Sequence, residues 1–232
     1  MGLNDFGAEK LAGRPLEFIF VIDVSGSMEG NKIESVNHAI RDVIPEMRRV
    51  SADNVNADIY VRALTFSSNV HWHIAQRTAV NQFSWSDISA GGLTSMGKAL
   101  SELADTLDVS KMPPRGLPPV LVLLSDGAPT DDFKVGLKNL LDKPWGQKAV
   151  KIAIAIGDDA DLEVLRKFIN NPEIEPLVAQ TASQLTTYIK WASTQVLSAA
   201  SSSKSSNDHN PKGNVAIPPA PQTINDPAAD IF

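Results

Sequence analysis

The chain has 232 residues, 43% of them hydrophobic, and a formal net charge of -6 at pH 7. The acidic balance argues against non-specific nucleic-acid binding, which relies on basic patches that displace counterions from phosphates. The absence of cysteine excludes a disulfide framework, a thiolate nucleophile and a thiolate zinc site within these residues.

The N-terminal sequence MGLNDFGAEK lacks the basic and then apolar order of a secretory signal. No apolar run in the chain approaches the roughly 18 to 20 residues that span a bilayer. We therefore expect a soluble protein with no membrane partner. The lack of cysteine is in keeping with a cytoplasmic location.

Strand-like and helix-like segments alternate from residue 15 to about residue 199. This pattern predicts a doubly wound α/β fold, with a mostly parallel central sheet and helices on both faces. Apolar runs predict strands at 18–22, 59–66, 70–74, 120–124, 150–156 and 174–178. Apolar residues at helical spacing, acidic first turns and an N-cap predict helices at 33–47, 95–107, 132–141, 161–169 and 181–197. The second and third strands follow each other so closely that we expect an antiparallel hairpin, with the third strand at the sheet edge.

The composition changes at residue 198, from an alternating pattern to a serine-rich and then a proline-rich sequence. We divide the chain into an N-terminal extension (1–14), one domain (15–199) and a tail (200–232) that is too polar and proline-rich to build a core. The tail is expected to be a flexible linker. The alternative is a docking peptide, in which Ile217, Ile231 and Phe232 enter a groove and Asp226 and Asp230 reach a metal on a neighbouring molecule.

The stretch FIFVIDVSGSM, residues 18–28, carries the first candidate site. Its apolar part reads as a strand buried on both faces, and Asp23, Ser25 and Ser27 follow at alternate positions where this strand opens into a loop. In open parallel sheets, ligands bind at the carboxyl ends of the strands. One carboxylate and two hydroxyls at that edge suit a small hard cation, although an Asp at this place can also accept a phosphoryl group.

Two further loops bring oxygen side chains to the same predicted edge. Thr94 follows Gly91 and Gly92 and precedes a helix, and Asp126 follows the apolar strand 120–124. Taken singly, Ser25, Ser27 and Thr94 would be helix caps and Asp23 a turn residue. Because three loops converge, we predict a metal site instead.

These three motifs together resemble the von Willebrand factor A (VWA) domain family over residues 15–197. The resemblance implies a Rossmann-like VWA fold with a metal-ion-dependent adhesion site (MIDAS). In that site Ser25, Ser27 and Thr94 supply hydroxyls, and Asp23 and Asp126 ligate the metal directly or through water.

Within the family, the stretches RPLEFIFVIDVSGSM, LLSDGAPTDD and TTYIKWAS resemble bacterial TerY-type proteins of tellurium resistance. This narrower resemblance implies an adaptor in a cytoplasmic stress phospho-signalling system. It also implies a Ser/Thr protein kinase and a PP2C-type phosphatase as partners. TerY relatives that carry a zinc ribbon differ from this chain, which has no cysteine.

The chemistry of the five residues supports a site for Mg²⁺, with Mn²⁺ as the other candidate. Mg²⁺ takes about six oxygens and gives up its waters reluctantly, so five protein groups leave room for an external ligand. Neutral hydroxyls leave the ion much of its positive charge, which attracts a carboxylate. We therefore expect a metal-dependent protein-binding module whose partner offers an Asp or Glu side chain.

Two alternative functions compete with this prediction. A magnesium-dependent phosphotransferase or phosphatase would use Asp23 as phosphoryl acceptor, but the haloacid-dehalogenase-like pattern places a second acid where this chain has Ser25. The chain also lacks the glycine-rich loops that cradle nucleotide phosphates, so we expect no enzyme. A scaffold that does not need metal would be expected to carry a degraded motif, and this motif is intact.

Overall fold

The computed structural model describes residues 13–158, 160–202, 215–222 and 232. The strands are β1 (Arg14–Asp23), β2 (Ala57–Phe66), β3 (Val70–Ala79), β4 (Val120–Ser125), β5 (Val150–Ile156) and β6 (Leu177–Ala179). The α-helices are α1 (Asn31–Asp53), α2 (Met96–Thr106), α3 (Phe133–Leu141), α4 (Pro144–Lys148), α5 (Leu162–Ile169), α6 (Ala182–Trp191) and α7 (Leu197–Ser201). A 3-10 turn, η1 (Gly26–Met28), precedes α1, and a π-helix, η2 (Ala192–Val196), joins α6 to α7.

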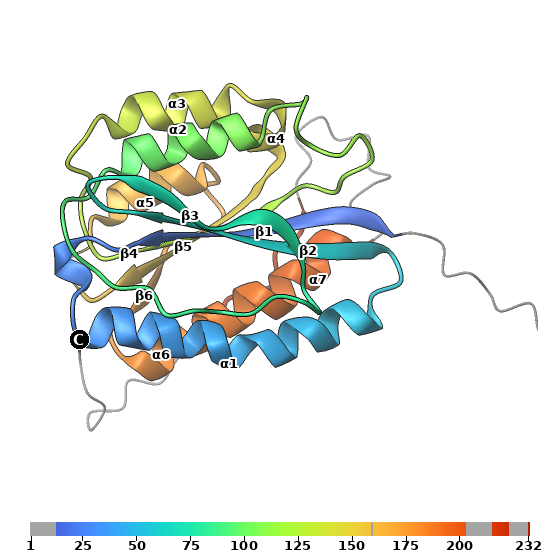
Figure 1. Ribbon diagram of the computed structural model, residues 1–232, viewed down its shortest axis with the longest axis horizontal. Coiled ribbons are helices and arrows are strands. Elements are labelled where there is room, and N and C mark those ends of the chain that lie inside the picture. Colours follow the sequence, from blue (N-terminus) through green and yellow to red (C-terminus); the bar gives the residue numbers. More distant parts are fainter. Residues whose placement is uncertain (1–12, 159, 203–214, 223–231) are drawn as a thin grey trace, which may run out of the picture.

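The strands form one sheet in the order β3-β2-β1-β4-β5-β6. All neighbouring pairs are parallel except β2 and β3, which are antiparallel, so the predicted fold class and the antiparallel edge strand are confirmed. Helices α1 and α6 cover one face of the sheet, and α2, α3 and α5 lie over the other (Figure 1). The carboxyl ends of β1 and β4 therefore meet near the middle of one sheet edge.

The central strand β1 is buried on both faces from Leu16 onward, as the apolar run 18–22 predicts. Phe18, Phe20 and Ile22 pack in the core beneath α1 and α6, whereas Ile19 and Val21 pack beneath α2. This alternation follows from the pleat, which points successive side chains to opposite faces. The same burial fixes the register that places Asp23 at the end of the strand.

Several elements differ from the sequence predictions. Strand β1 begins earlier, at Arg14, and α1 and β3 continue to Asp53 and Ala79. The strand expected at 174–178 begins only at Leu177, because Pro176 immediately before it has no N–H for the sheet ladder. The last helix continues beyond residue 197 to Ser201 through the π-helix η2. The short helix α4 was not predicted, since its five residues are too few to show helical spacing.

Lys151 of β5 is a buried basic residue that should make the stability of the fold depend on pH. Its Nζ donates to the carbonyls of Gly146 and Ala149, at 2.9 and 3.2 Å, and burial lowers its pKa to about 8. Above that pH the unfolded chain, with a lysine pKa of 10.5, still binds a proton that the folded chain has lost. Raising the pH through this window therefore favours the folded state.

We expect this residue to add about 2 kcal/mol to the free energy of unfolding between roughly pH 7 and pH 10. The measurement is urea unfolding at both pH values for the wild type and for Lys151→Met, which cannot titrate. The difference between the two proteins isolates Lys151 from other titrating groups. The same pH dependence in both proteins would contradict the prediction.

Candidate metal centre

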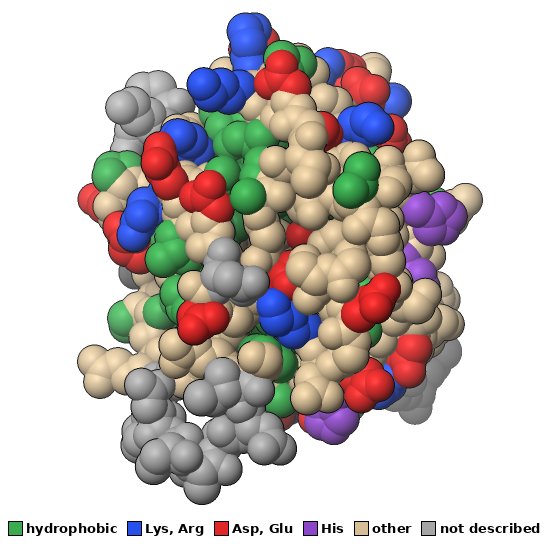
Figure 2. Space-filling model, turned by 90° about the vertical axis from the view of Figure 1, so that its left-hand side faces the viewer, with side chains coloured by type: hydrophobic (Ala, Val, Ile, Leu, Met, Phe, Trp, Pro, Cys, Tyr) green, Lys and Arg blue, Asp and Glu red, His purple; other side chains and the backbone are tan. Residues whose placement is uncertain are grey.

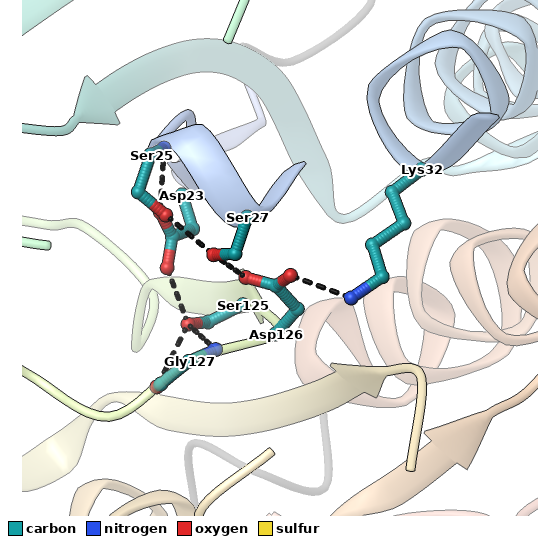
Figure 3. Close-up of polar contacts among 7 residues, drawn as sticks. All are labelled: Asp23, Ser25, Ser27, Lys32, Ser125, Asp126 and Gly127. Carbon is teal, nitrogen blue, oxygen red and sulfur yellow. Dashed lines mark hydrogen bonds and ion pairs between the residues drawn. The ribbon is translucent and has the colours of Figure 1, made fainter. Parts of the chain in front are cut away.

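Asp23 ends β1 and is fully buried. Its Oδ1 accepts a hydrogen bond from the backbone N–H of Ser25 at 2.9 Å, and its Oδ2 accepts one from the Ser125 hydroxyl at 2.6 Å (Figure 3). Burial raises the pKa of Asp23 above its ordinary value, and the hydrogen bonds from Ser125 and Ser25 only partly oppose this. A cation next to this carboxylate would favour its ionised form.

A chain of hydrogen bonds links the first loop to Asp126, which follows β4. The Ser25 and Ser27 hydroxyls are 3.1 Å apart, and the Ser27 hydroxyl donates to Asp126 Oδ1 at 2.8 Å (Figure 3). Asp23, Ser25, Ser27 and Asp126 therefore lie together. Their proximity follows from the pairing of β1 with β4, which brings the carboxyl ends of the two strands side by side. Asp126, like Asp23, is buried.

Thr94 joins this group from the loop before α2. A Cβ built on Gly127 would lie 3.7 Å from the Ser27 hydroxyl and 3.8 Å from the Thr94 hydroxyl, so both hydroxyls border the same space beside Gly127. The loop is tied to the first motif by a hydrogen bond from Gly26 N–H to the Gly92 carbonyl at 2.9 Å. The structure thus brings all five predicted residues to one sheet edge.

The hydroxyls of this group do not serve as helix caps. Ser25 precedes η1 but its side chain makes no capping bond, and the residue that precedes α2 is Ser95 rather than Thr94. In contrast, Asp131 accepts from two N–H groups in the first turn of α2, and Asp132 caps α3. These two acids are therefore engaged in helix starts and not in an acid–base pair.

Lys32 is a member of this site that the sequence analysis missed. It lies in the first turn of α1, and its Nζ is 2.6 Å from Asp126 Oδ2. The Lys32 side chain is only 14% exposed and the Asp126 side chain is fully buried. A lysine in the first turn of a helix is unfavourable next to the helix dipole. This unusual position was the one sequence feature that could have indicated an acidic partner for Lys32. Ser125 was missed as well, although it stands beside Asp126 in the motif.

The donor set fits a hard cation. It consists of carboxylate and hydroxyl oxygens, without sulfur or imidazole, which is the preference of Mg²⁺ and Mn²⁺. Over the described part of the chain, no cluster of three or more His, Cys, Asp or Glu side chains could hold a metal ion, so a cation at this edge would depend on the hydroxyls as well as the two carboxylates. Figure 2 looks onto this edge, where neutral polar groups and backbone cover much of the middle, with acidic side chains beside a basic one.

The chain is an open α/β domain with a cluster of oxygen side chains at the carboxyl ends of β1 and β4. Residues 17–196 match the sequence model of the von Willebrand factor type A domain, and the chain belongs to that family. Over the described residues, no helix is long and apolar enough to cross a membrane.

Two curated relatives are heavy chains of inter-alpha-trypsin inhibitor. Heavy chain H6 of Homo sapiens is 31% identical over 165 residues, which are 64% of this chain and 12% of that protein. Heavy chain H3 of Mus musculus is 35% identical over 79 residues, which are 33% of this chain and 8% of that protein. The chain therefore spans only a small part of the curated relatives it matches.

Solved structures share the fold at low identity. The pilus adhesin SpaC of Lactobacillus rhamnosus GG superposes with a TM-score of 0.63 at 15% identity, over 79% of this chain and 31% of that one. The ArnB paralog VWA2 of Sulfolobus acidocaldarius gives a TM-score of 0.57 at 21% identity, over 78% of this chain and 45% of that one.

Proposed function

We propose that this VWA domain is a metal-dependent protein-binding module. The observation that carries the proposal is the convergence of five oxygen side chains from three loops. The Ser25 and Thr94 hydroxyls among them do not cap a helix. The metal-holding residues would be Asp23, Ser25, Ser27, Thr94 and Asp126. Mg²⁺ is the expected ion, and Mn²⁺ is the alternative with the same ligand preference.

The bound ion would supply a positive charge that attracts a carboxylate from a partner protein. Asp23 would contribute negative charge from a buried position, where Ser25 and Ser125 orient its two oxygens. The three neutral hydroxyls would hold the ion without cancelling its remaining charge. An Asp or Glu side chain of the partner would then complete the shell of about six oxygens.

We infer a narrower role from the sequence motifs alone. The TerY-type stretches support an adaptor in a bacterial cytoplasmic stress or tellurium-resistance phospho-signalling system, with a Ser/Thr kinase and a PP2C-type phosphatase as partners. We expect no enzymatic activity, because Ser25 stands where phosphoryl-transfer chemistry would need a second acid. Asp131 and Asp132 cannot substitute for that acid while they cap helices.

Calorimetric titration of Mg²⁺ tests the metal site. We expect the wild-type chain to give saturable binding heat and Asp23→Ala to give none, because the variant loses the buried carboxylate that ends β1. Asp105→Ala is the matched control, since Asp105 is an exposed acid on α2. Equal heats from the wild type and Asp23→Ala would contradict the proposed site.

A further inference from the structure

Residues 215–222, with the sequence VAIPPAPQ, pack against the domain without forming a helix or a strand. Val215 and Ile217 contact the core cluster that lies beneath α1 and α6. The indole N–H of Trp191, the last residue of α6, donates to the carbonyl oxygen of Pro219 at 3.1 Å. The segment therefore makes both an apolar and a polar contact with the body of the domain.

The surface that receives this segment exists because β6 is short. Its three residues pair with Ile154–Ile156 of β5, so among the described residues the first half of β5 has no strand partner on that side. The groove beside it, which we call the tail groove, encloses a cavity of about 190 Å³. The body of the domain lines it with the apolar side chains of Ile152, Ile174, Leu177 and Trp191 and with two acids, Glu173 and Glu175. Ile217, Pro218, Pro219 and Ala220 of the tail lie across from them.

The contacts in the tail groove follow the chemistry by which proteins recognise proline-rich segments. Proline restricts φ and removes the N–H, so an extended proline-rich segment loses little entropy on binding and offers only carbonyl oxygens. An aromatic groove with a donor suits such a segment. Trp191 supplies both features, because its indole lines the groove and its N–H donates to the Pro219 carbonyl. It also directly precedes the π-helix η2, a type of turn that is frequent at functional sites.

We propose that the tail groove is a binding site for proline-rich peptides and that this chain's own residues 215–222 are its ligand in cis. The recognised pattern is Ile-Pro-Pro-x-Pro, with the isoleucine in the apolar groove and the second proline's carbonyl on Trp191. This site is separate from the metal centre, none of whose five residues lines it. A partner that carries the same pattern has to displace the tail.

Cleavage of the connecting segment in the full chain tests this proposal. A protease site is placed within residues 203–214, and the cut protein is analysed by size-exclusion chromatography with mass detection. We expect the C-terminal fragment to co-elute with one domain, and an excess of the synthetic peptide VAIPPAPQ to displace it. A fragment that separates at once, or that is retained only in dimers with exchanged tails, would overturn the proposal.

Matched variants show whether the specific contacts carry the binding. Ile217→Asp should weaken retention of the fragment about tenfold or more, because it places a charge in the apolar groove. Ala216→Asp adds the same charge at an exposed position and should leave retention unchanged. Trp191→Phe keeps an aromatic ring, although a smaller one, but loses the N–H, and should weaken retention about two- to tenfold. Equal release by the Ile217 and Ala216 variants would contradict a groove of this kind.

Discussion

Replacing Gly136 by alanine should lower the free energy of unfolding by about 2 to 4 kcal/mol, an effect at or above the usual range for overpacking. Gly136 of α3 faces Gly97 of α2, and a Cβ at Gly136 would lie 2.1 Å from the Gly97 carbonyl oxygen. A Cβ at Gly97 would in turn lie 2.4 Å from the Asp132 carbonyl oxygen. The two helices thus touch through their backbones, and the added methyl group has to push them apart.

The sign of this result separates two effects. Helix propensity alone favours alanine over glycine by roughly 0.5 to 1 kcal/mol, so a stabilised variant would mean that the close contact is not formed. Val135→Ala on the same helix is the control, because Val135 is 52% exposed and should change stability by only about 0.5 kcal/mol. Thermal unfolding should show a fall in Tm of roughly 2 to 4 °C for each kcal/mol lost at Gly136.

The α2–α3 contact also positions the candidate site. The loop before α3 is tied to the loop before α2 by a hydrogen bond from Thr130 N–H to the Thr94 carbonyl at 2.8 Å. Thr94 N–H returns a bond to the Thr130 hydroxyl at 3.2 Å. The contact between the helices and the placement of Thr94 beside Asp126 therefore depend on the same short segment.

The sequence predicted the fold well where burial alone determines the element. β1, β4 and β5 consist mostly of apolar residues, and each was placed within a few residues of its observed bounds. The shifted start of β6 shows the opposite case, because one proline that removes a ladder hydrogen bond outweighs the apolar character of Ile174. Helix α4 is too short for any periodic signal.

The candidate site was predictable to the extent that its residues form sequence motifs. Asp23, Ser25 and Ser27 occur at fixed spacing, and Thr94 and Asp126 follow recognisable loops and strands. Lys32 belongs to no such motif, and its role depends on how the start of α1 lies against the end of β4. The position of residues 215–222 could not be predicted from composition either. It depends on the surface of β5 that the short strand β6 leaves uncovered.

Replacing Lys32 by methionine should lower the free energy of unfolding of the metal-free protein by about 2 to 3 kcal/mol. Removing one partner of a buried ion pair leaves the other charge uncompensated, which commonly costs about 3 to 5 kcal/mol. The expected loss is smaller here because Lys32 is partly exposed and Ser27 still donates to Asp126. Lys32→Arg keeps the charge and is the control. Urea unfolding in the presence of a chelator measures the difference.

Added Mg²⁺ should restore part of the stability that Lys32→Met loses. This expectation rests on the proposed metal site. Lys32 places a positive charge 2.6 Å from Asp126, so the bound ion would meet repulsion from the ammonium in the wild type. Without that ammonium, the ion becomes the main source of positive charge beside Asp126. The rise in Tm on adding Mg²⁺ should therefore be larger for Lys32→Met than for the wild type or Lys32→Arg. An equal rise in all three proteins would mean that the lysine and the ion do not act on the same carboxylate.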